Sequence, residues 1–275
     1  PPTARPPRRI GRRLARVGLG LIIPVLFVAG WQLFVSDGVL PRAVVPGPMK
    51  VLDALQMWLG TKKTPVMFYS DHLFSDVGAT LGRVALGFAL ATVAGVALGT
   101  AVGVWRLADS LLTPTFRILG PIPPVTWIPV VIVVLGVGQS ANLALTVLGA
   151  VFPIIASTVT AVSGVNRELL RAGRMMGQGP LGLIAHVILP VSLPGIVGGL
   201  RLGLGLSWMM GVTSEMLAVH SGLGYTLWNA YNYFDYPGVF AAMMVIGLCG
   251  LLSDLLLQVV TRRPTRWHAE TGVRS

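Results

Sequence analysis

Residues 118–166 read ILGPIPPVTWIPVVIVVLGVGQSANLALTVLGAVFPIIASTVTAVSGVN, and these 49 residues contain no Asp, Glu, Lys or Arg. A transmembrane helix needs about 20 mostly apolar residues, so this stretch is long enough to cross a bilayer twice. The whole chain of 275 residues agrees, because 53% of its residues are hydrophobic and 11% are charged. Soluble domains carry about 25% charged residues. We therefore expect a membrane protein rather than a soluble domain.

Six apolar segments are predicted to span the membrane as helices, because backbone exposed to lipid must satisfy its own hydrogen bonds. Their apolar runs are continuous and lack the alternation of barrel strands. The fold class is thus an all-α polytopic membrane protein. The expected spans are Val17–Val35, about Val84–Val104, 114–136, 140–163, Leu189–Val219 and Pro237–Val260, within a transmembrane domain of residues 17–263 that lies between tails at 1–16 and 264–275.

The distribution of basic residues predicts the orientation of these spans. Six Arg lie within the first sixteen residues, directly before an apolar run, which is typical of a cytosolic N-terminus. Six crossings then place both termini in the cytoplasm. This topology places 15 basic residues, among them Arg106 and Arg117, on the cytosolic side of the membrane. It places five basic residues, among them Arg83, on the outer side. The net charge of +11 therefore indicates a chain in the cell inner (plasma) membrane and not a nucleic-acid partner.

The longest expected outer loop, residues 36–77, contains one amphipathic helix. Its apolar residues follow the spacing of a single helix face. They are Val51, Ala54, Leu55, Trp58 and Leu59. Two placements are open for this helix: flat on the outer membrane interface, or packed against the transmembrane helices.

Two of the expected spans carry a ridge of small residues at every fourth position. Such ridges let helix backbones approach closely, which is how helices associate within lipid. We expect the two ridges to pair in the core of the protein. They are Gly87, Ala91, Gly95, Gly99 and Gly103 in the second span, and Gly195, Gly199, Gly203, Ser207 and Gly211 in the fifth.

No motif in the sequence indicates catalysis. The three Lys residues do not occur in a phosphate-binding P-loop, and the four His residues lack the spacing of a metal site. The single cysteine, Cys249, lies in an apolar run and forms no disulfide within the chain. We expect a protein that is not an enzyme, with no catalytic residue, metal or cofactor of its own.

A polar cationic segment at residues 164–188 interrupts the apolar spans on the expected cytosolic side. Asn166 is a favourable cap for a helix that Gly177 and Gly179 then end. Arg171 and Arg174 share one face of this helix with Arg167. The segment fits either a helix that inserts into a groove of a cytosolic partner or a plain cytosolic loop.

This segment resembles the EAA loop of ABC-importer permeases, the membrane subunits of binding-protein-dependent uptake systems. The pattern A-x-x-x-x-G-x9-[IV]-x-L-P is carried by Ala172, Gly177, Val187, Leu189 and Pro190. Arg171 stands where Glu is usual, and Gly173 where Ala is usual. Further matches over about residues 40–268 resemble the nitrate, sulfonate and taurine branch: Pro121–Pro129, Leu193–Trp208, Glu215–Leu217, Gly222–Tyr225 and Arg262–Trp267.

The resemblance implies the type I permease fold and an assembly in which two copies of this chain form a homodimer. It also implies two copies of a separate ABC ATPase that holds ATP and Mg²⁺, and a periplasmic or lipid-anchored solute-binding protein on the outer face. The solute implied is a sulfonate, taurine, nitrate or a similar small anion. The residues implied in coupling to the ATPase are Glu168, Arg171, Ala172, Arg174, Met175, Met176 and Gly177.

Charged residues inside spans are costly and usually face an interior. Arg201 and Glu215 are fourteen residues apart on one helix, about 21 Å at 1.5 Å per residue, so each needs another partner. Asp254, in the sixth span, is expected to form a local salt bridge or cap. For Arg201 and Glu215 two roles are open: a structural role within the protein, or a contact with the transported solute. The possible residues of a translocation path are Trp127, Arg201, Met209, Thr213 and Glu215.

Two other classes of protein were compared with an ATP-driven permease. A secondary transporter driven by an ion gradient needs an intramembrane ion relay or inverted repeats, and the chain offers isolated charges without a clear repeat. A membrane-embedded enzyme needs a nucleophile with its base, or a metal, and no such set is visible.

Overall fold

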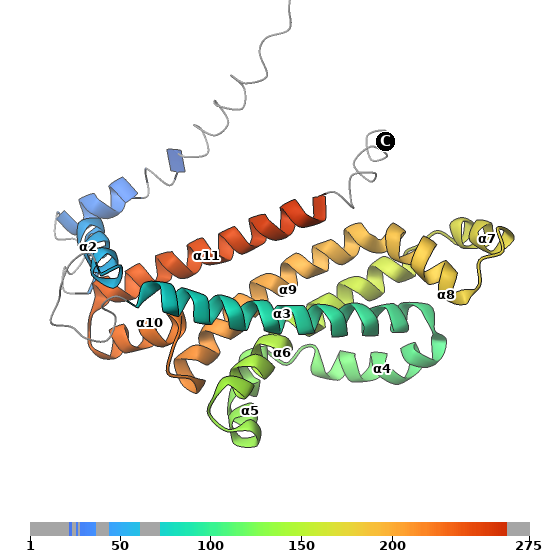
Figure 1. Cartoon of the computed structure of the whole chain (residues 1–275), viewed down its shortest axis with the longest axis horizontal. Helices are drawn as coiled ribbons and strands as arrows, with labels where there is room; N and C mark the ends of the chain where they lie inside the picture. The colour runs from blue at the N-terminus through green and yellow to red at the C-terminus, as the bar shows by residue number, and fades with distance from the viewer. Residues whose placement is uncertain (1–21, 24–25, 27, 37–43, 61–71, 263–275) are drawn as a thin grey trace, which may run out of the picture. The chain divides into compact units, whose positions relative to one another are not determined.

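The computed structural model describes residues 22–23, 26, 28–36, 44–60 and 72–262, and all regular secondary structure among them is helical (Figure 1). The contacts divide the chain into two compact units. One combines residues up to 71 with Ala230–Ala241, and the other combines His72–Asn229 with the residues from Ala242 onward. Both predicted tails and part of the first predicted span, residues 17–21, 24–25 and 27, lie outside the described residues.

The first unit contains the predicted amphipathic helix, α2 (Pro48–Trp58). Its apolar face is buried: Val51 and Ala54 form a hydrophobic cluster with Ala241 of α11 (Tyr236–Arg262). Of the two placements left open by the sequence, the described residues therefore support packing against another helix.

The second unit consists of long helices joined by short turns. The fourth, fifth and sixth predicted spans are confirmed as helices with nearly the expected bounds. The elements in chain order are α3 (Leu73–Val104), α4 (Arg106–Leu119), the 3-10 turn η1 (Pro124–Trp127), α5 (Ile128–Leu135), α6 (Gln139–Ser163), α7 (Arg167–Met175), α8 (Pro180–Leu183), the π-helical η2 (Ile184–Ile188), α9 (Leu189–Ala218), most of α10 (Leu223–Asn232) and most of α11.

Four described helical segments are long and apolar enough to cross a membrane: α3, α6, the continuous segment Pro180–Ala218, and α11. A fifth crossing is formed if the bent pair of α4 with η1–α5 counts as one span. The first predicted span, Val17–Val35, is described only in part, and its described residues, 22–23, 26 and 28–35, are helical.

Helix α6 lies between α3 and α9, and the glycine ridges make this close packing possible (Figure 1). A Cβ atom added at Gly95 of α3 would lie 2.7 Å from Ile154 Cγ2, and one at Gly203 of α9 would lie 2.7 Å from Ile154 Cγ1. Both ridges are thus in the core. The predicted pairing of the ridges with each other is wrong along most of their length, because α6 separates them.

The residue pairs in these contacts also fix the directions of the three helices. In the contacts between α3 and α6 the residue numbers of both helices rise together, so these two helices are parallel. In the contacts between α6 and α9 the numbers of one helix rise as those of the other fall, so these two helices are antiparallel. A crossing is therefore required between α3 and α6, and α4 with α5 supply it. The close contacts join Gly87 to Thr146 and Gly103 to Val162 across the first pair, and Gly195 to Ala161 and Gly211 to Thr146 across the second.

This returning crossing was predicted as one span near 114–136, interrupted by proline. Helix α4 already begins at Arg106, and α4 and η1–α5 meet at an angle of 90°. The break lies between Gly120 and Pro123, where Pro121 and Pro123 have no backbone N–H to continue the helical hydrogen bonds. The prediction counted these prolines within one span and did not place the bend.

The early start of α4 also corrects the position of Arg117, which was assigned to the cytosol. The ring of its neighbour Phe116 makes an edge contact with Phe152, with centroids 6.3 Å apart. Phe152 lies close to the middle of the 25-residue helix α6. Arg117 is therefore at the depth of the middle of the bundle.

Two glycines on the same helix test the packing of α9 against α6. Gly203→Ala should destabilise the protein by about 1–3 kcal/mol, because its Cβ atom would press on Ile154. Gly205→Ala is the matched control, since a Cβ atom there meets no atom within 4 Å. Thermal melting of the two purified variants in detergent measures the difference, and equal melting temperatures would contradict the packing.

Candidate functional site

Helix α7 is a short polar helix with well-formed ends. As predicted, Asn166 caps its start: the side-chain oxygen accepts a hydrogen bond of 2.9 Å from the backbone N–H of Glu168. At the other end Gly177 adopts a φ of +79°, and its N–H donates to the carbonyl of Arg174. The N–H of Gln178 donates to the carbonyl of Gly173, which completes a Schellman motif. The predicted end of the helix at Gly177 is confirmed.

One face of α7 is fixed to the rest of the second unit. Gly173 is the buried residue of the helix, and a Cβ atom there would lie 2.8 Å from Leu183 Cδ1. Leu170 packs against a cluster of buried residues that includes Val162 and Ile188. The glycine at the position where the resembled loop usually has alanine thus allows α7 to approach α8 closely.

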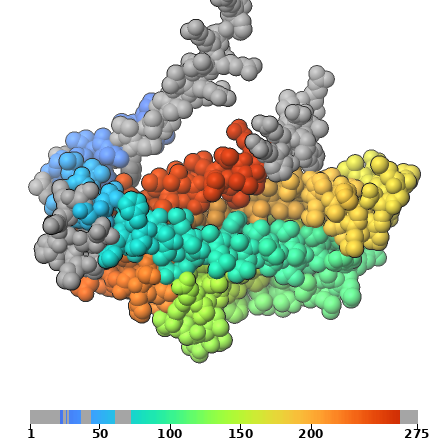
Figure 2. All heavy atoms as spheres, in the orientation of Figure 1, coloured from blue at the N-terminus to red at the C-terminus, as the bar shows by residue number. Residues whose placement is uncertain are grey.

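The opposite face of α7 is exposed and carries every residue predicted to couple to an ATPase. Met175 and Met176 are 83% and 81% exposed, and the nearby Leu181 is 76% exposed. In Figure 2 this segment, drawn in yellow, protrudes at one end of the second unit. The coupling residues exposed there are Glu168, Arg171, Ala172, Arg174, Met175, Met176 and Gly177.

At the other end of α9, Glu215 lies in a buried polar cluster. Its carboxylate forms an ion pair of 2.8 Å with Arg83 of α3, and their side chains are 1% and 8% exposed. Thr80 Oγ1 donates a second hydrogen bond of 2.9 Å to the same carboxylate. The prediction that Glu215 needs a partner other than Arg201 is confirmed.

This cluster also binds the backbone of the turn that follows α9. The N–H of Gly224 donates to Glu215 Oε2 at 2.9 Å, and the N–H of Leu223 donates to Thr80 Oγ1 at 2.8 Å. Arg83 donates to the carbonyl of Ser221 at 2.8 Å. The turn leaves room for the carboxylate because a Cβ atom at Gly222 would lie 2.6 Å from it. Glu215 therefore holds α3, α9 and the start of α10 together.

Arg201, the other charged residue of α9, is paired with α11. Its guanidinium donates two hydrogen bonds of 2.9 Å to Asp254, and Gln258 donates a further bond of 2.7 Å to that carboxylate. Asp254 forms a salt bridge as predicted, but its partner lies on another helix and is not local. Bidentate geometry is the strong form of such a pair.

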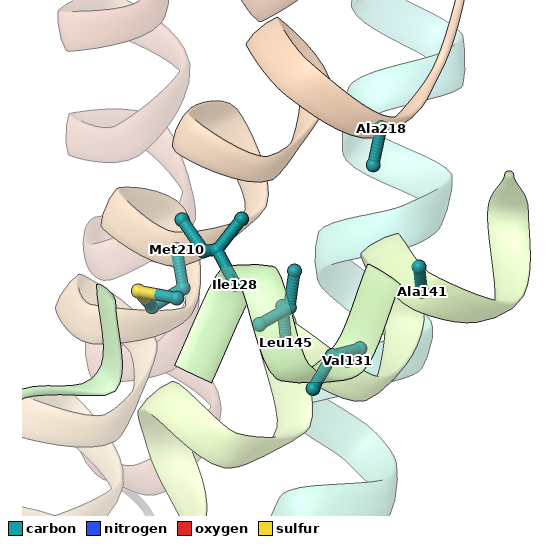
Figure 3. Close-up of a cluster of buried hydrophobic side chains, with 6 residues drawn as sticks. All are labelled: Ile128, Val131, Ala141, Leu145, Met210 and Ala218. Atoms are coloured by element: carbon teal, nitrogen blue, oxygen red, sulfur yellow. The ribbon is translucent and has the colours of Figure 1, made fainter. Parts of the chain in front are cut away.

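Of the remaining predicted path residues, Trp127 lies where α5 packs on α6 and α9, whereas Met209 and Thr213 lie on α9. Figure 3 shows the buried cluster at this junction, which includes Ile128 of α5 and Met210 of α9. Trp127 is partly buried against the cluster. Met209 is 50% exposed, and Thr213 Oγ1 donates to its carbonyl at 2.7 Å. A contact of these residues with solute stays a prediction.

Sequence reasoning missed the partners of Glu215 on α3. Arg83 was counted as a charge of the outer side, and the helix was expected to begin only at Val84. The signal was present, because Asp76, Thr80 and Arg83 are spaced by four and three residues and share one helix face. In the described part of the chain, no group of three or more His, Cys, Asp or Glu residues is arranged to hold a metal ion.

The family model described as "Binding-protein-dependent transport system inner membrane component" matches residues 91–266. A probable ABC transporter permease protein of Brucella abortus is 34% identical over 256 residues, which cover 93% of this chain and 98% of the relative. A nitrate import permease protein of Leptolyngbya laminosa is 34% identical over 191 residues, with coverages of 70% and 68%.

Among solved structures, a chain of the MetNI methionine ABC transporter in an inward facing conformation has a similar fold. The TM-score is 0.62, and the match covers 74% of this chain and 100% of that chain at 22% sequence identity. The all-α permease fold expected from the resemblance is confirmed by this match.

The buried ion pair gives a test of the polar cluster. Glu215→Gln should destabilise the protein by about 3–5 kcal/mol, because it leaves the Arg83 guanidinium buried without its counter-charge. The double variant Arg83→Met with Glu215→Met should recover part of this loss. Glu168→Gln, an exposed carboxylate on α7, is the control. Thermal melting in detergent measures the series, and a single variant as stable as the control would be evidence against the cluster.

Proposed function

Because this chain belongs to the family of inner membrane components of binding-protein-dependent transport systems, we propose that α7 couples its helices to a separate ATPase. The membrane part then forms a path for a small solute, and the energy comes from ATP hydrolysis outside this chain. ATP and Mg²⁺ are bound by the partner ATPase. The family membership favours this function over a secondary transporter driven by an ion gradient.

The exposed face of α7 carries this proposal. Large apolar side chains at the end of a polar helix are unfavourable in water, and flexible methionines are common at docking surfaces. Met175, Met176 and Leu181 supply such a surface, and Arg171 of α7 is exposed as well. This arrangement suits insertion into a groove of a protein partner.

Helix α7 is also attached so that a displacement reaches the membrane part. Gly173 contacts Leu183, and Leu170 packs on a cluster that contains Ile188. From Pro180 the chain continues without interruption into α9. A movement of α7 imposed by two ATPase subunits is therefore transferred to α9, and opens or closes the solute path.

A second copy of the chain and a solute-binding protein complete the proposed assembly. Val133 and Val134 of α5 are 84% and 72% exposed, so they need lipid or another protein chain to cover them. We propose that the second copy of a homodimer covers these two side chains. We also propose that the turn after α9, together with α10, is the docking surface for a periplasmic or lipid-anchored solute-binding protein. The solute proposed is a small anion such as a sulfonate, taurine or nitrate, in line with the nitrate import relative.

The orientation proposed for the inner membrane places α7 and both termini in the cytoplasm. The exposed Arg106 and Arg174 lie at the α7 end of the second unit, as the positive-inside rule requires of a cytosolic side. The α2 segment is then on the outer side.

Cysteine labelling tests this orientation. Cys249→Ala removes the natural thiol, after which Met176→Cys should react with a membrane-impermeant maleimide only in inside-out vesicles. Met49→Cys, at a methionine that is 70% exposed on α2, should react only in right-side-out vesicles. Labelling of Met176→Cys from the outer side would disprove a cytosolic coupling helix.

The turn at the end of α7 tests coupling. Gly177→Val should abolish most ATP-dependent uptake in proteoliposomes while the ATPase still hydrolyses ATP, because valine strains a φ of +79° and displaces the end of the helix. Gly179→Val is the matched control, since Gly179 has a φ of −69° and open space around its Cβ position. Wild-type uptake by the Gly177 variant would count against the docking role.

A further inference from the structure

Arg117 differs from the other two arginines that lie within the helical bundle. Arg83 and Arg201 each form an ion pair with a carboxylate of another helix. The guanidinium of Arg117 has no ion pair or hydrogen bond with any residue in the described part of the chain. It nevertheless lies at the depth of Phe152, near the middle of α6. An intramembrane charge at this depth indicates a functional site.

Arg117 lines a pocket in the second unit. The pocket has a volume of about 670 Å³ and is bounded by α3, α4, the break after α4, α6 and α9. Only two of its lining side chains are polar, Thr113 and Arg117. Thr113 already donates a hydrogen bond to Asp109. Arg117, an exposed side chain, is therefore the single charge on the lining of an otherwise apolar pocket that is open on one side.

The walls of the pocket suit the body of an organic molecule. Phe116 and Phe152 form an aromatic wall, and Leu148 and Leu206 supply aliphatic surface from α6 and α9. Pockets of about 300–1,000 Å³ take small organic ligands. An ion the size of nitrate would use the guanidinium and leave most of these walls without contact.

The backbone beside Arg117 has the geometry of a transport site. The chain breaks at Gly120–Pro123 and turns by 90° between α4 and η1–α5. Discontinuous helices at the middle of the membrane form substrate sites in other transporters, because broken backbone is tolerated where it lines a cavity.

We propose that this pocket binds the transported solute, with Arg117 holding its anionic group and the aromatic wall holding an apolar body. The solute class is then an organic anion, a sulfonate or carboxylate with an aromatic or aliphatic body, in preference to an inorganic anion. This inference rests on the proposed transport function. A guanidinium forms paired hydrogen bonds with such oxyanions, which makes Arg117 the residue that determines specificity.

Equilibrium binding of ³⁵S-labelled naphthalene-2-sulfonate to the permease–ATPase complex in nanodiscs tests the assignment, with empty nanodiscs as background. Arg117→Gln should weaken binding by about tenfold or more, because it removes a charge-assisted hydrogen bond. Arg117→Lys should recover only part of the binding lost in Arg117→Gln, because it keeps the charge but not the paired hydrogen bonds of the guanidinium. Unlabelled nitrate and the neutral methyl naphthyl sulfone should compete poorly.

Arg106→Gln is the matched control, because Arg106 is an exposed arginine at the start of α4 that does not line the pocket. It should leave probe binding unchanged. Elution of each variant as an intact complex shows that it folds. Unchanged binding by Arg117→Gln, or equal competition by the neutral sulfone, would overturn the assignment.

ATP hydrolysis by the same complexes separates this inference from the proposed function. A complex that assembles and hydrolyses ATP, but binds the probe independently of Arg117, overturns the pocket assignment alone. Failure of the chain to assemble with an ATPase overturns the proposed function itself. Loss of the dimer in Arg117→Gln, or loss of co-purifying anionic lipid without any change in probe binding, would assign the guanidinium to a second copy or to a lipid headgroup and would overturn the proposal.

Discussion

The architecture of the second unit depends on backbone contact along α6. The glycines of α3 and of α9 let these two helices approach α6 from two sides, until Ile154 of α6 fills the space next to both Gly95 and Gly203. Lipid tails are as apolar as these side chains, so moving an apolar side chain from lipid to a helix interface gains little free energy. Close packing and polar contacts therefore hold the helices together. The parallel course of α3 and α6 follows from the spacing of these contacts. That course in turn requires the crossing formed by α4 and α5.

Helix α9 connects the two ends of the second unit. It contains 30 residues, a length of about 45 Å at 1.5 Å per residue. Its first residues follow α8 and the surface on which α7 packs, and its last turns hold Glu215 and the turn around Gly222. The exposed face of α7 and the start of α10 are thus linked through one continuous helix.

The sequence was sufficient to predict the fold class, the last three spans and the caps of α7, because these follow from apolar length and from local chemistry at Asn166 and Gly177. It was not sufficient for contacts between distant segments. The spacing of the glycines indicated a close approach but not that α6 was the partner. Arg83 and Arg117 were misplaced for a related reason: charge was used to mark the ends of spans, although a buried carboxylate or a pocket also accommodates an arginine. Proline marked the break near Gly120, but its angle depends on tertiary packing.

The ion pairs of α9 bear on how the chain is assembled in the membrane. Arg83 precedes Glu215 in the chain, so the partner of the carboxylate has been synthesised when α9 enters the bilayer. Asp254 follows Arg201 by 53 residues and is supplied only with α11. During synthesis α9 therefore carries one charge that is neutralised at once and one that waits for the last described helix. The insertion of α11 therefore supplies the carboxylate that pairs with the half-exposed Arg201.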